Sequence, residues 1–204
     1  GGADPPEAFR IVGQVENTFL LAYSKGYLYV IDQHAAHERA LYERLQSAIA
    51  RGEPPRRTLI APQVLLLSAR EMDLLEQHRS ELEACGFLFD RFGPEAVAVR
   101  ALPDVIQPRE GESFCRQLIP RLREVVINRR AETVPQMLAC LAAVTAGTSL
   151  LPEEQERLLR AWMTSDHPDA CAHNRPVYSR LHLDEVRQKI GRTAGGCGAP
   201  PDPV

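Results

Sequence analysis

The sequence predicts an α+β fold, and three features of its hydrophobic pattern support this prediction. Apolar residues rich in Val, Ile, Phe and Tyr fill 9–15, 17–23 and 27–31, with turn residues between them, which is typical of a short antiparallel meander. From residue 33 to about residue 50 the apolar residues recur with a helical period instead. Further amphipathic segments and short strand-like runs follow. We therefore expect a small antiparallel sheet with helices, joined to a second unit of helices and strands.

Capping and breaking residues place the first elements. Asp32 closes the third strand and is a natural N-cap for the helix that follows, which ends near Gly52. Ser68 and Glu71 have the spacing of a capping box, which predicts another helix. Gly86 is a natural residue just beyond the C-terminus of that helix.

Similar signals place the later elements. Gly93 marks a hairpin turn, and Pro152 followed by two glutamates is typical of a first helical turn. Extended segments are expected at 59–62 and 64–67, and a hairpin of 87–89 and 96–99 is followed by a break at Leu102 and Pro103. Helices are expected at 114–127, 135–146 and 152–164. The last elements are an irregular stretch at 166–176, a strand at 177–181 and a short helix at 183–190. Residues 1–8 are expected to be a linker remnant and 192–204 a disordered tail.

The composition excludes several classes of protein. The net charge is -3, so this is not a strongly basic nucleic-acid binder, and DNA affinity would have to come from partners or from local arginines such as Arg121, Arg123, Arg129 and Arg130. No apolar run approaches the roughly 20 residues of a membrane span. Five cysteines, an odd number at wide spacing, argue against a disulfide framework and favour a reduced, cytoplasmic chain.

Two short clusters carry metal-binding chemistry. Asp32 ends a strand, and His34 and Glu38 stand four residues apart on one helix face, so the three can converge on a divalent cation. The alternative is a capped surface helix without a metal. Cys171 and His173, two apart in an irregular stretch, form a half-site for zinc, and the alternative is a buried cysteine beside an exposed histidine.

Three motifs carry a family resemblance. Residues 32–43 match the pattern DQHA, two residues, E, four residues, E at every defined position. In this the chain resembles the C-terminal dimerisation and endonuclease domain of the MutL family of DNA mismatch repair proteins. Residues 171–176 resemble the family's Cys-Pro-His-Gly-Arg-Pro motif, with Ala172 and Asn174 as departures. Cys140 stands in a third motif, where Leu141 replaces a basic residue.

The resemblance implies a domain organisation and a set of partners. It implies a homodimer formed through a sheet-containing subdomain (9–68 and 136–191), with a smaller external regulatory subdomain (69–135). It also implies an N-terminal ATPase domain in a longer bacterial protein, which would be the only part to bind ATP. The implied partners are duplex DNA, a sliding clamp and, through the full-length protein, the mismatch-recognition protein MutS. A membrane is not among them.

The resemblance also implies the site. The metal ligands would be Asp32, His34, Glu38, Cys171 and His173, with Zn²⁺ and/or Mn²⁺ as the cation. Asp32 and Glu38 would be the catalytic pair, with Glu38 bridging two ions. The residues expected near the ligands, or supporting them, are Cys140, Arg39, Glu43 and Arg175.

A further family motif, Gln-x-x-Leu/Ile-x-Pro, binds the sliding clamp. Leu59, Ile60 and Pro62 stand where it is expected, while Arg57 replaces the Gln. An ordinary edge strand is the alternative explanation of this segment.

Three functions remain open from the sequence. The first is a metal-dependent endonuclease that nicks duplex DNA. The second is a non-catalytic dimerisation module with a structural zinc site. The third is an unrelated metallohydrolase that acts on small substrates.

Overall fold

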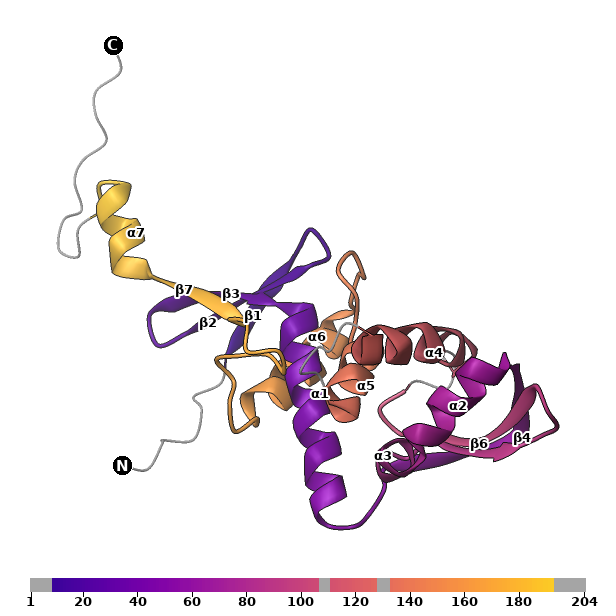
Figure 1. The fold of residues 1–204 in the computed structure, drawn as a ribbon. Coiled ribbons are helices and arrows are strands. Elements are labelled where there is room, and N and C mark those ends of the chain that lie inside the picture. Colours follow the sequence, from indigo (N-terminus) through magenta and orange to yellow (C-terminus); the bar gives the residue numbers. More distant parts are fainter. Residues whose placement is uncertain (1–8, 107–110, 128–132, 193–204) are drawn as a thin grey trace.

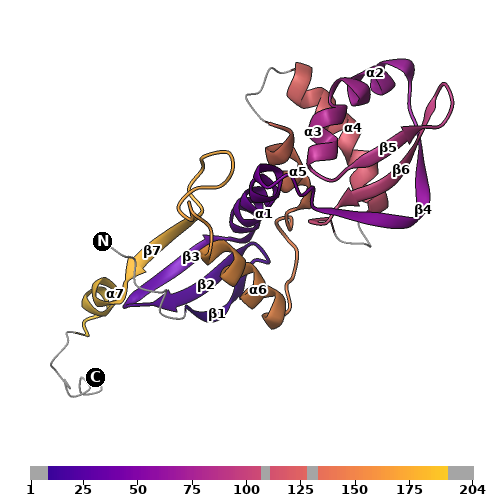
Figure 2. The same cartoon turned by 90° about the horizontal axis from the view of Figure 1, so that it is seen from below.

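The computed structural model describes residues 9–106, 111–127 and 133–192. Two sheets lie at opposite ends of an elongated molecule, and helices α1 (Gln33–Ala50) and α5 (Val134–Ala142) lie between them (Figures 1 and 2). This confirms the α+β fold. The predicted linker at 1–8, the tail from residue 193, and Arg129 and Arg130 fall outside the described residues.

The first sheet is the predicted meander with one strand added. Its order is β1-β2-β3-β7, and every neighbouring pair is antiparallel. The strands are β1 (Arg10–Val15), β2 (Phe19–Ser24), β3 (Tyr27–Asp32) and β7 (Tyr178–His182). Helix α7 (Leu183–Lys189) follows β7, has no buried residue and projects away from the body (Figure 1).

One face of this sheet packs against α6 (Pro152–Met163). Leu20 and Ile31 from the sheet form a buried cluster with Leu158 and Trp162 from the helix. The other face is apolar but exposed. Leu28 pairs with Leu181 and Leu21 with Val30 on that face, and Val30 and Leu181 remain 36% and 40% exposed.

The second sheet has the order β4-β6-β5, again antiparallel. Its strands are β4 (Arg56–Leu66), β6 (Ala96–Pro103) and β5 (Leu88–Arg91). Helices α2 (Ala69–Gln77), α3 (Arg79–Ala84) and α4 (Gly111–Ile127) belong to the same end of the molecule (Figure 2). Val97, Val99, Leu118 and Leu122 lie in the larger buried cluster that these elements share.

Several predicted elements were wrong in their bounds. The extended segments at 59–62 and 64–67 are one strand, and Leu102 and Pro103 end β6 instead of breaking the chain. Helix α4 begins at Gly111, not at residue 114. The helix expected from residue 68 to 85 divides at His78, although its capping box and its end are as predicted. Gly86 has a φ of +93°, and a Cβ there would lie 2.3 Å from the Pro55 carbonyl oxygen, so only glycine fits.

Helix α5 also ends earlier than predicted, at Ala142 instead of residue 146. Ala143 is already extended, with φ -69° and ψ 147°. The backbone of Val144 bonds to side chains of α1 instead of continuing the helix. Tertiary hydrogen bonds therefore override the helical period of this segment.

The predicted division into 9–68 with 136–191 and 69–135 stays a prediction. Strand β4, which precedes residue 68, pairs with β6, which follows it. Helix α1 contributes Leu41 and Leu45 to the larger buried cluster, and Ala35 and Ala36 to the smaller one. None of the helices in the described part of the chain combines the length and the apolar composition that crossing a membrane requires.

Candidate metal centre

The centre begins where β3 passes into α1. Asp32 ends β3, and its Oδ1 accepts a hydrogen bond from the backbone N–H of Ala35 at 3.0 Å. An extended residue with a side-chain acceptor is the favoured N-cap. The cap fixes where the first turn starts, and His34 and Glu38 then project from one face of α1.

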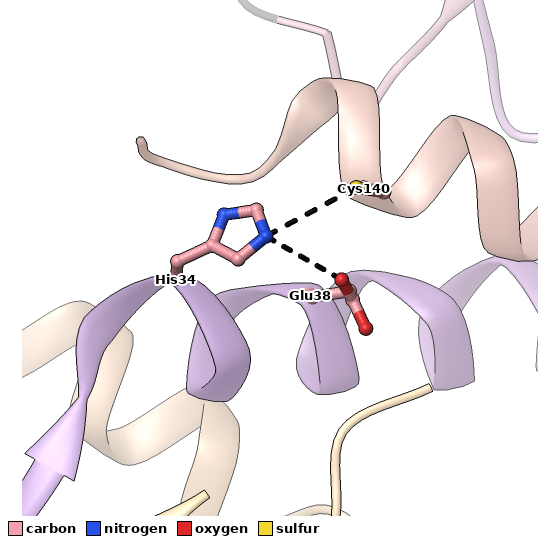
Figure 3. Close-up of side chains that lie close together, drawn as sticks. All are labelled: His34, Glu38 and Cys140. Atoms are coloured by element: carbon pink, nitrogen blue, oxygen red, sulfur yellow. Dashed lines mark hydrogen bonds and ion pairs between the residues drawn. The ribbon is translucent and has the colours of Figure 1, made fainter. Parts of the chain in front are cut away.

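His34 is held through one ring nitrogen and presents the other. Its Nδ1 bonds to the carbonyl oxygen of Val144 at 2.9 Å. Its Nε2 lies 3.5 Å from Glu38 Oε2 and 4.0 Å from the Sγ of Cys140 on α5 (Figure 3). The Cys140 thiol and the Glu38 carboxylate together raise the pKa of His34 to about 10. These contacts therefore favour the protonated form of the imidazole.

Glu38 is the central residue of the site. Its side chain is fully buried, and its Oε1 accepts a hydrogen bond from Nδ1 of His173 at 2.8 Å. Burial raises the pKa of Glu38, but the neighbouring imidazoles of His34 and His173 outweigh it and lower the pKa to about 2. Oε2 has no hydrogen-bond partner among the described residues. A buried, ionised oxygen without a hydrogen bond is costly unless a cation satisfies it.

Cys171 and His173 stand in a tight turn before β7. The N–H of Cys171 donates to the Arg175 carbonyl at 2.8 Å, and the N–H of Asn174 donates to the Cys171 carbonyl at 2.9 Å. Asn174 has a φ of 60°. The N–H of His173 points to the Cys171 sulfur at 3.3 Å. The turn thereby brings the thiol and the imidazole to the same side, as their spacing predicts.

The structure forms two groups of atoms that could hold a metal ion, and both groups include Glu38. One consists of His34, Glu38 and Cys140, the other of Glu38, Cys171 and His173, and the ligand atoms of each group lie within 4.8 Å of one another. Thiolate, imidazole and carboxylate are the donors that zinc takes in proteins. Oε2 of Glu38, which has no hydrogen-bond partner in the described residues and lies 3.5 Å from His34, and this donor chemistry fit a divalent cation.

Other predicted residues lie around this centre in different roles. Asp32 belongs to neither group of ligand atoms among the described residues. Arg39 donates to the carbonyls of Ala170 and Cys171. A hydrogen bond to the Cys171 thiol raises the pKa of the exposed Arg175 guanidinium.

Glu43 takes part in holding the same loop. It accepts hydrogen bonds from the backbone N–H groups of Asp166, at 2.7 Å, and His167, at 3.2 Å, and lies 3.6 Å from Arg39. Arg39 and Glu43 thus fix the backbone that leads to Cys171.

The sequence predicts His37 as a structural support of the site, whereas Gln33 and Gln136 were missed by sequence reasoning. His37 accepts a hydrogen bond from the N–H of Val144 at 3.0 Å through Nδ1, and burial, followed by the charge of His34, lowers its pKa to about 4. Gln33 is buried, and Gln136 donates to the Ala172 carbonyl at 2.8 Å. Only Gln33 and His37 had a sequence signal, since both stand inside the twelve-residue motif.

The predicted clamp-binding residues lie far from this centre, on β4 at the edge of the second sheet. The pairing of β4 with β6 shifts register between Thr58 and Gln63, and Ile60 within this interval is fully exposed. Leu59 packs against the larger buried cluster. The Arg57 guanidinium donates to the carbonyls of Asp104 and Ile106, so it is engaged within the fold.

All four cysteines in the described ranges are free, and Cys85 and Cys115 are buried away from the centre. Burial raises the pKa of each of these two thiols to about 12, so they are inert compared with an activated thiol. Leu141, the departure from the third motif, packs against the larger cluster.

Comparison with known proteins adds the following findings. A family model described as the MutL C terminal dimerisation domain matches residues 12–150. Proteins named DNA mismatch repair protein MutL are similar to the chain in Nitrobacter winogradskyi (36% identity over 183 residues), Agrobacterium fabrum (31% over 184) and Rhodopseudomonas palustris (34% over 183). Each alignment covers 88% of this chain and 30% of the relative, so the chain spans under a third of these relatives' length.

Proposed function

The chain belongs to the MutL family of DNA mismatch repair proteins, and from that premise we propose that it is a metal-dependent endonuclease domain that nicks duplex DNA. The observation that carries the proposal is the buried Glu38 carboxylate. It lies between two groups of thiol and imidazole donors, and one of its oxygens has no hydrogen-bond partner in the described structure. Such an arrangement favours cation binding over a purely structural polar cluster.

The residues that would hold the cations are His34, Glu38, Cys140, Cys171 and His173. A divalent cation supplies a low-pKa water and stabilises charge that develops at phosphorus. Glu38 is already ionised, and belongs to both donor groups, which suits a bridging ligand. His34 holds a proton at neutral pH when no cation is bound, so cation binding is expected to release it. Arg175, exposed beside Cys171, is placed to donate hydrogen bonds to a phosphate.

The first test is nicking of supercoiled plasmid in the presence of Mn²⁺. Glu38→Gln keeps the shape of the side chain but removes the charge, so we expect it to abolish nicking and to weaken metal binding. Glu53→Gln makes the same change on an exposed carboxylate just beyond α1 and should leave both unchanged. Nicking by Glu38→Gln at the wild-type rate would refute the proposal. Asp32→Asn in the same assay tests the predicted ligand that lies outside both donor groups.

DNA affinity is proposed to depend on partners, because a net charge of -3 gives little attraction for phosphate. We place contact with a sliding clamp at the exposed β4 edge. Ile60→Glu should abolish the stimulation of nicking by a clamp without changing basal nicking. Phe92→Glu, which changes another exposed apolar side chain of the second sheet's hairpin, is the control. Undiminished stimulation of the Ile60→Glu variant would disprove clamp binding through this segment.

Homodimerisation is proposed to use the exposed apolar face of the first sheet. Val15, Val30 and Leu181 lie on that face and are 36–43% exposed, next to the half-buried Leu21 and Leu28. A contiguous apolar sheet face of this kind typically marks a protein–protein interface. The ATPase domain and contact with MutS implied by the resemblance concern the longer protein.

A second candidate function is a non-catalytic dimerisation module with a structural zinc site. It is favoured by the position of Asp32, whose carboxylate caps α1 and belongs to neither donor group in the described residues. Structural zinc contributes directly to folding stability. On this alternative, a chelator would lower the melting temperature and the dimer content, and no metal would support nicking.

A further inference from the structure

The segment after α5 reaches the metal centre through its backbone. Val144 uses both of its main-chain polar groups on α1. Its N–H donates to Nδ1 of His37 at 3.0 Å, and its carbonyl oxygen accepts from Nδ1 of His34 at 2.9 Å. Two imidazoles three residues apart on one helix therefore hold the two ends of a single residue. The His37 bond requires Nδ1 without a proton, whereas the His34 bond requires Nδ1 with one.

We propose that His37 is a positioning residue of this centre, which holds Val144 so that the Val144 carbonyl turns Nε2 of His34 toward Glu38 and Cys140. The inference rests on the proposed metal site, and it assigns a role to a histidine that belongs to neither donor group. His37 acts through Val144 and His34 and contacts no ligand itself.

The physical reason is the freedom of the His34 ring. An imidazole can turn about its side-chain bonds, and in the neutral form that binds a cation either nitrogen can carry the proton. A hydrogen bond from Nδ1 to a fixed acceptor removes this freedom and leaves Nε2 as the ligand atom. In Figure 3 the His34 ring lies between α1 and α5 with Nε2 facing Glu38 and Cys140. How well Nε2 of His34 stays directed at Glu38 and Cys140 depends on how firmly the Val144 carbonyl is held.

Nothing in α5 holds that carbonyl. The helix ends at Ala142, and the extended Ala143 makes the last bond to the helix, from its N–H to the Ala139 carbonyl. The N–H of Val144 is the first beyond this bond, and His37 provides its acceptor. Removal of that acceptor leaves the Ala143–Val144 peptide unit free to rotate, and the Val144 carbonyl, which lies in the next peptide unit, is then held less firmly.

The rest of the segment has a separate attachment. Nε2 of Gln33 donates to the carbonyls of Thr145, at 3.2 Å, and Thr148, at 3.1 Å, while the N–H of Gly147 donates to the Asn17 carbonyl at 2.9 Å. These bonds do not involve Val144. A change at His37 should therefore leave the segment folded against α1 and disturb only the two peptide units that meet at Val144.

The experiment compares two variants of the chain. His37→Phe keeps a ring but removes the acceptor. His37→Asn places an amide oxygen close to the position of Nδ1 and serves as the conservative replacement. Two quantities are measured: the hydrogen-bonded Nδ1–H of His34 as a slowly exchanging NMR signal, and the affinity for Zn²⁺ by competition with a chelator. Thermal unfolding by circular dichroism confirms that each variant is folded.

The expected result for His37→Phe is loss of the His34 ring N–H signal and Zn²⁺ binding weakened by about 10- to 100-fold. His37→Asn should keep both the His34 ring N–H signal and the wild-type affinity for Zn²⁺. If His37→Phe does not fold, His37→Leu replaces it as the variant without an acceptor.

Two results would overturn the inference. One is an unchanged His34 signal and Zn²⁺ affinity in the variant without an acceptor, which would leave the metal site standing. The other is the same loss in His37→Asn, which would make His37 a packing residue. If the wild-type chain binds no Zn²⁺, but the His34 signal is lost in His37→Phe and kept in His37→Asn, the proposed function is refuted and the positioning role is supported.

Discussion

At Asn174 the backbone has a φ of 60°, in the left-handed region that Gly and Asn enter most readily. The related family motif carries Gly at this position, so Asn meets the same conformational requirement. The turn depends on it, because the N–H of Asn174 bonds to the carbonyl of Cys171 and folds His173 back toward the thiol. This departure from the motif therefore preserves the geometry of the site.

Substitution at this position tests the requirement. We expect Asn174→Val to lower the free energy of unfolding by about 1–2 kcal/mol, since a β-branched residue is strained at positive φ. Asn174→Gly should stay close to the wild type. Urea unfolding of the metal-free protein measures both, and equal stability of the Val and Gly variants would contradict this account.

The candidate site itself could be predicted in part. His34, Glu38, Cys171 and His173 come together as expected, since each stands in a motif defined by ligand-type residues. The role of a carboxylate at the end of a strand, as in Asp32, depends on which backbone or metal it meets. Similarly, the role of His37 depends on Val144, more than 100 residues away in the sequence. Such roles follow from the fold and not from spacing.

Helix α1 supports the loop that carries Cys171 as well as the metal-binding side chains. Arg39, which is 8% exposed, donates from one guanidinium to the carbonyls of Ala170 and Cys171. Glu43, one turn further along, accepts from two N–H groups of the same loop. The helix therefore fixes both the ligands and the backbone opposite them.

Removal of this support should be measurable in the loop alone. Arg39→Met removes the side-chain donor of the Ala170 carbonyl and one of the two donors of the Cys171 carbonyl, so we expect a loss of about 1–3 kcal/mol in the free energy of unfolding. Faster hydrogen exchange should appear across 166–176. Arg51→Met, which removes an arginine that is largely exposed, is the control and should change neither quantity. Unchanged exchange in the Arg39→Met loop would argue against the role of Arg39.

Elements with strong local signals were predicted well, and elements bounded by tertiary contacts were not. The meander and α1 follow from alternation, helical period and the Asp32 cap. The early end of α5 depends on hydrogen bonds between Val144 and α1, which no local pattern contains. The division of the predicted helix at His78 is different, because the contact found there is local: the ring of His78 lies 3.0 Å from Glu81, and α3 begins after His78.

The two ends of the molecule differ in how their sheets meet solvent. The first sheet buries one face under α6 and exposes an apolar face that includes Val30 and Leu181. The second sheet exposes apolar side chains near its β4 edge, among them Ile60 and Leu66. Dimerisation and clamp contact are thus proposed for opposite ends, so that each can be disrupted without the other.

A lysine introduced into one sheet at a time tests whether the dimer interface lies on the first sheet. Leu181→Lys should dissociate the dimer, because it places an ammonium group in the apolar face. Leu66→Lys adds the same charge to the second sheet and should leave the dimer intact. Sedimentation velocity over a range of concentrations distinguishes the two. A dimeric Leu181→Lys variant would move the interface away from the first sheet.

Helix α1 contributes side chains to both buried clusters, Ala35 and Ala36 to one and Leu41 and Leu45 to the other. Neither cluster can lose its structure while α1 keeps all of its contacts, so the two halves of the chain are expected to unfold cooperatively. The candidate metal centre lies on the same helix, between the two clusters. A cation bound there would therefore raise the unfolding free energy of the whole domain by mass action, so that metal supply would govern how long the protein survives as well as whether it acts.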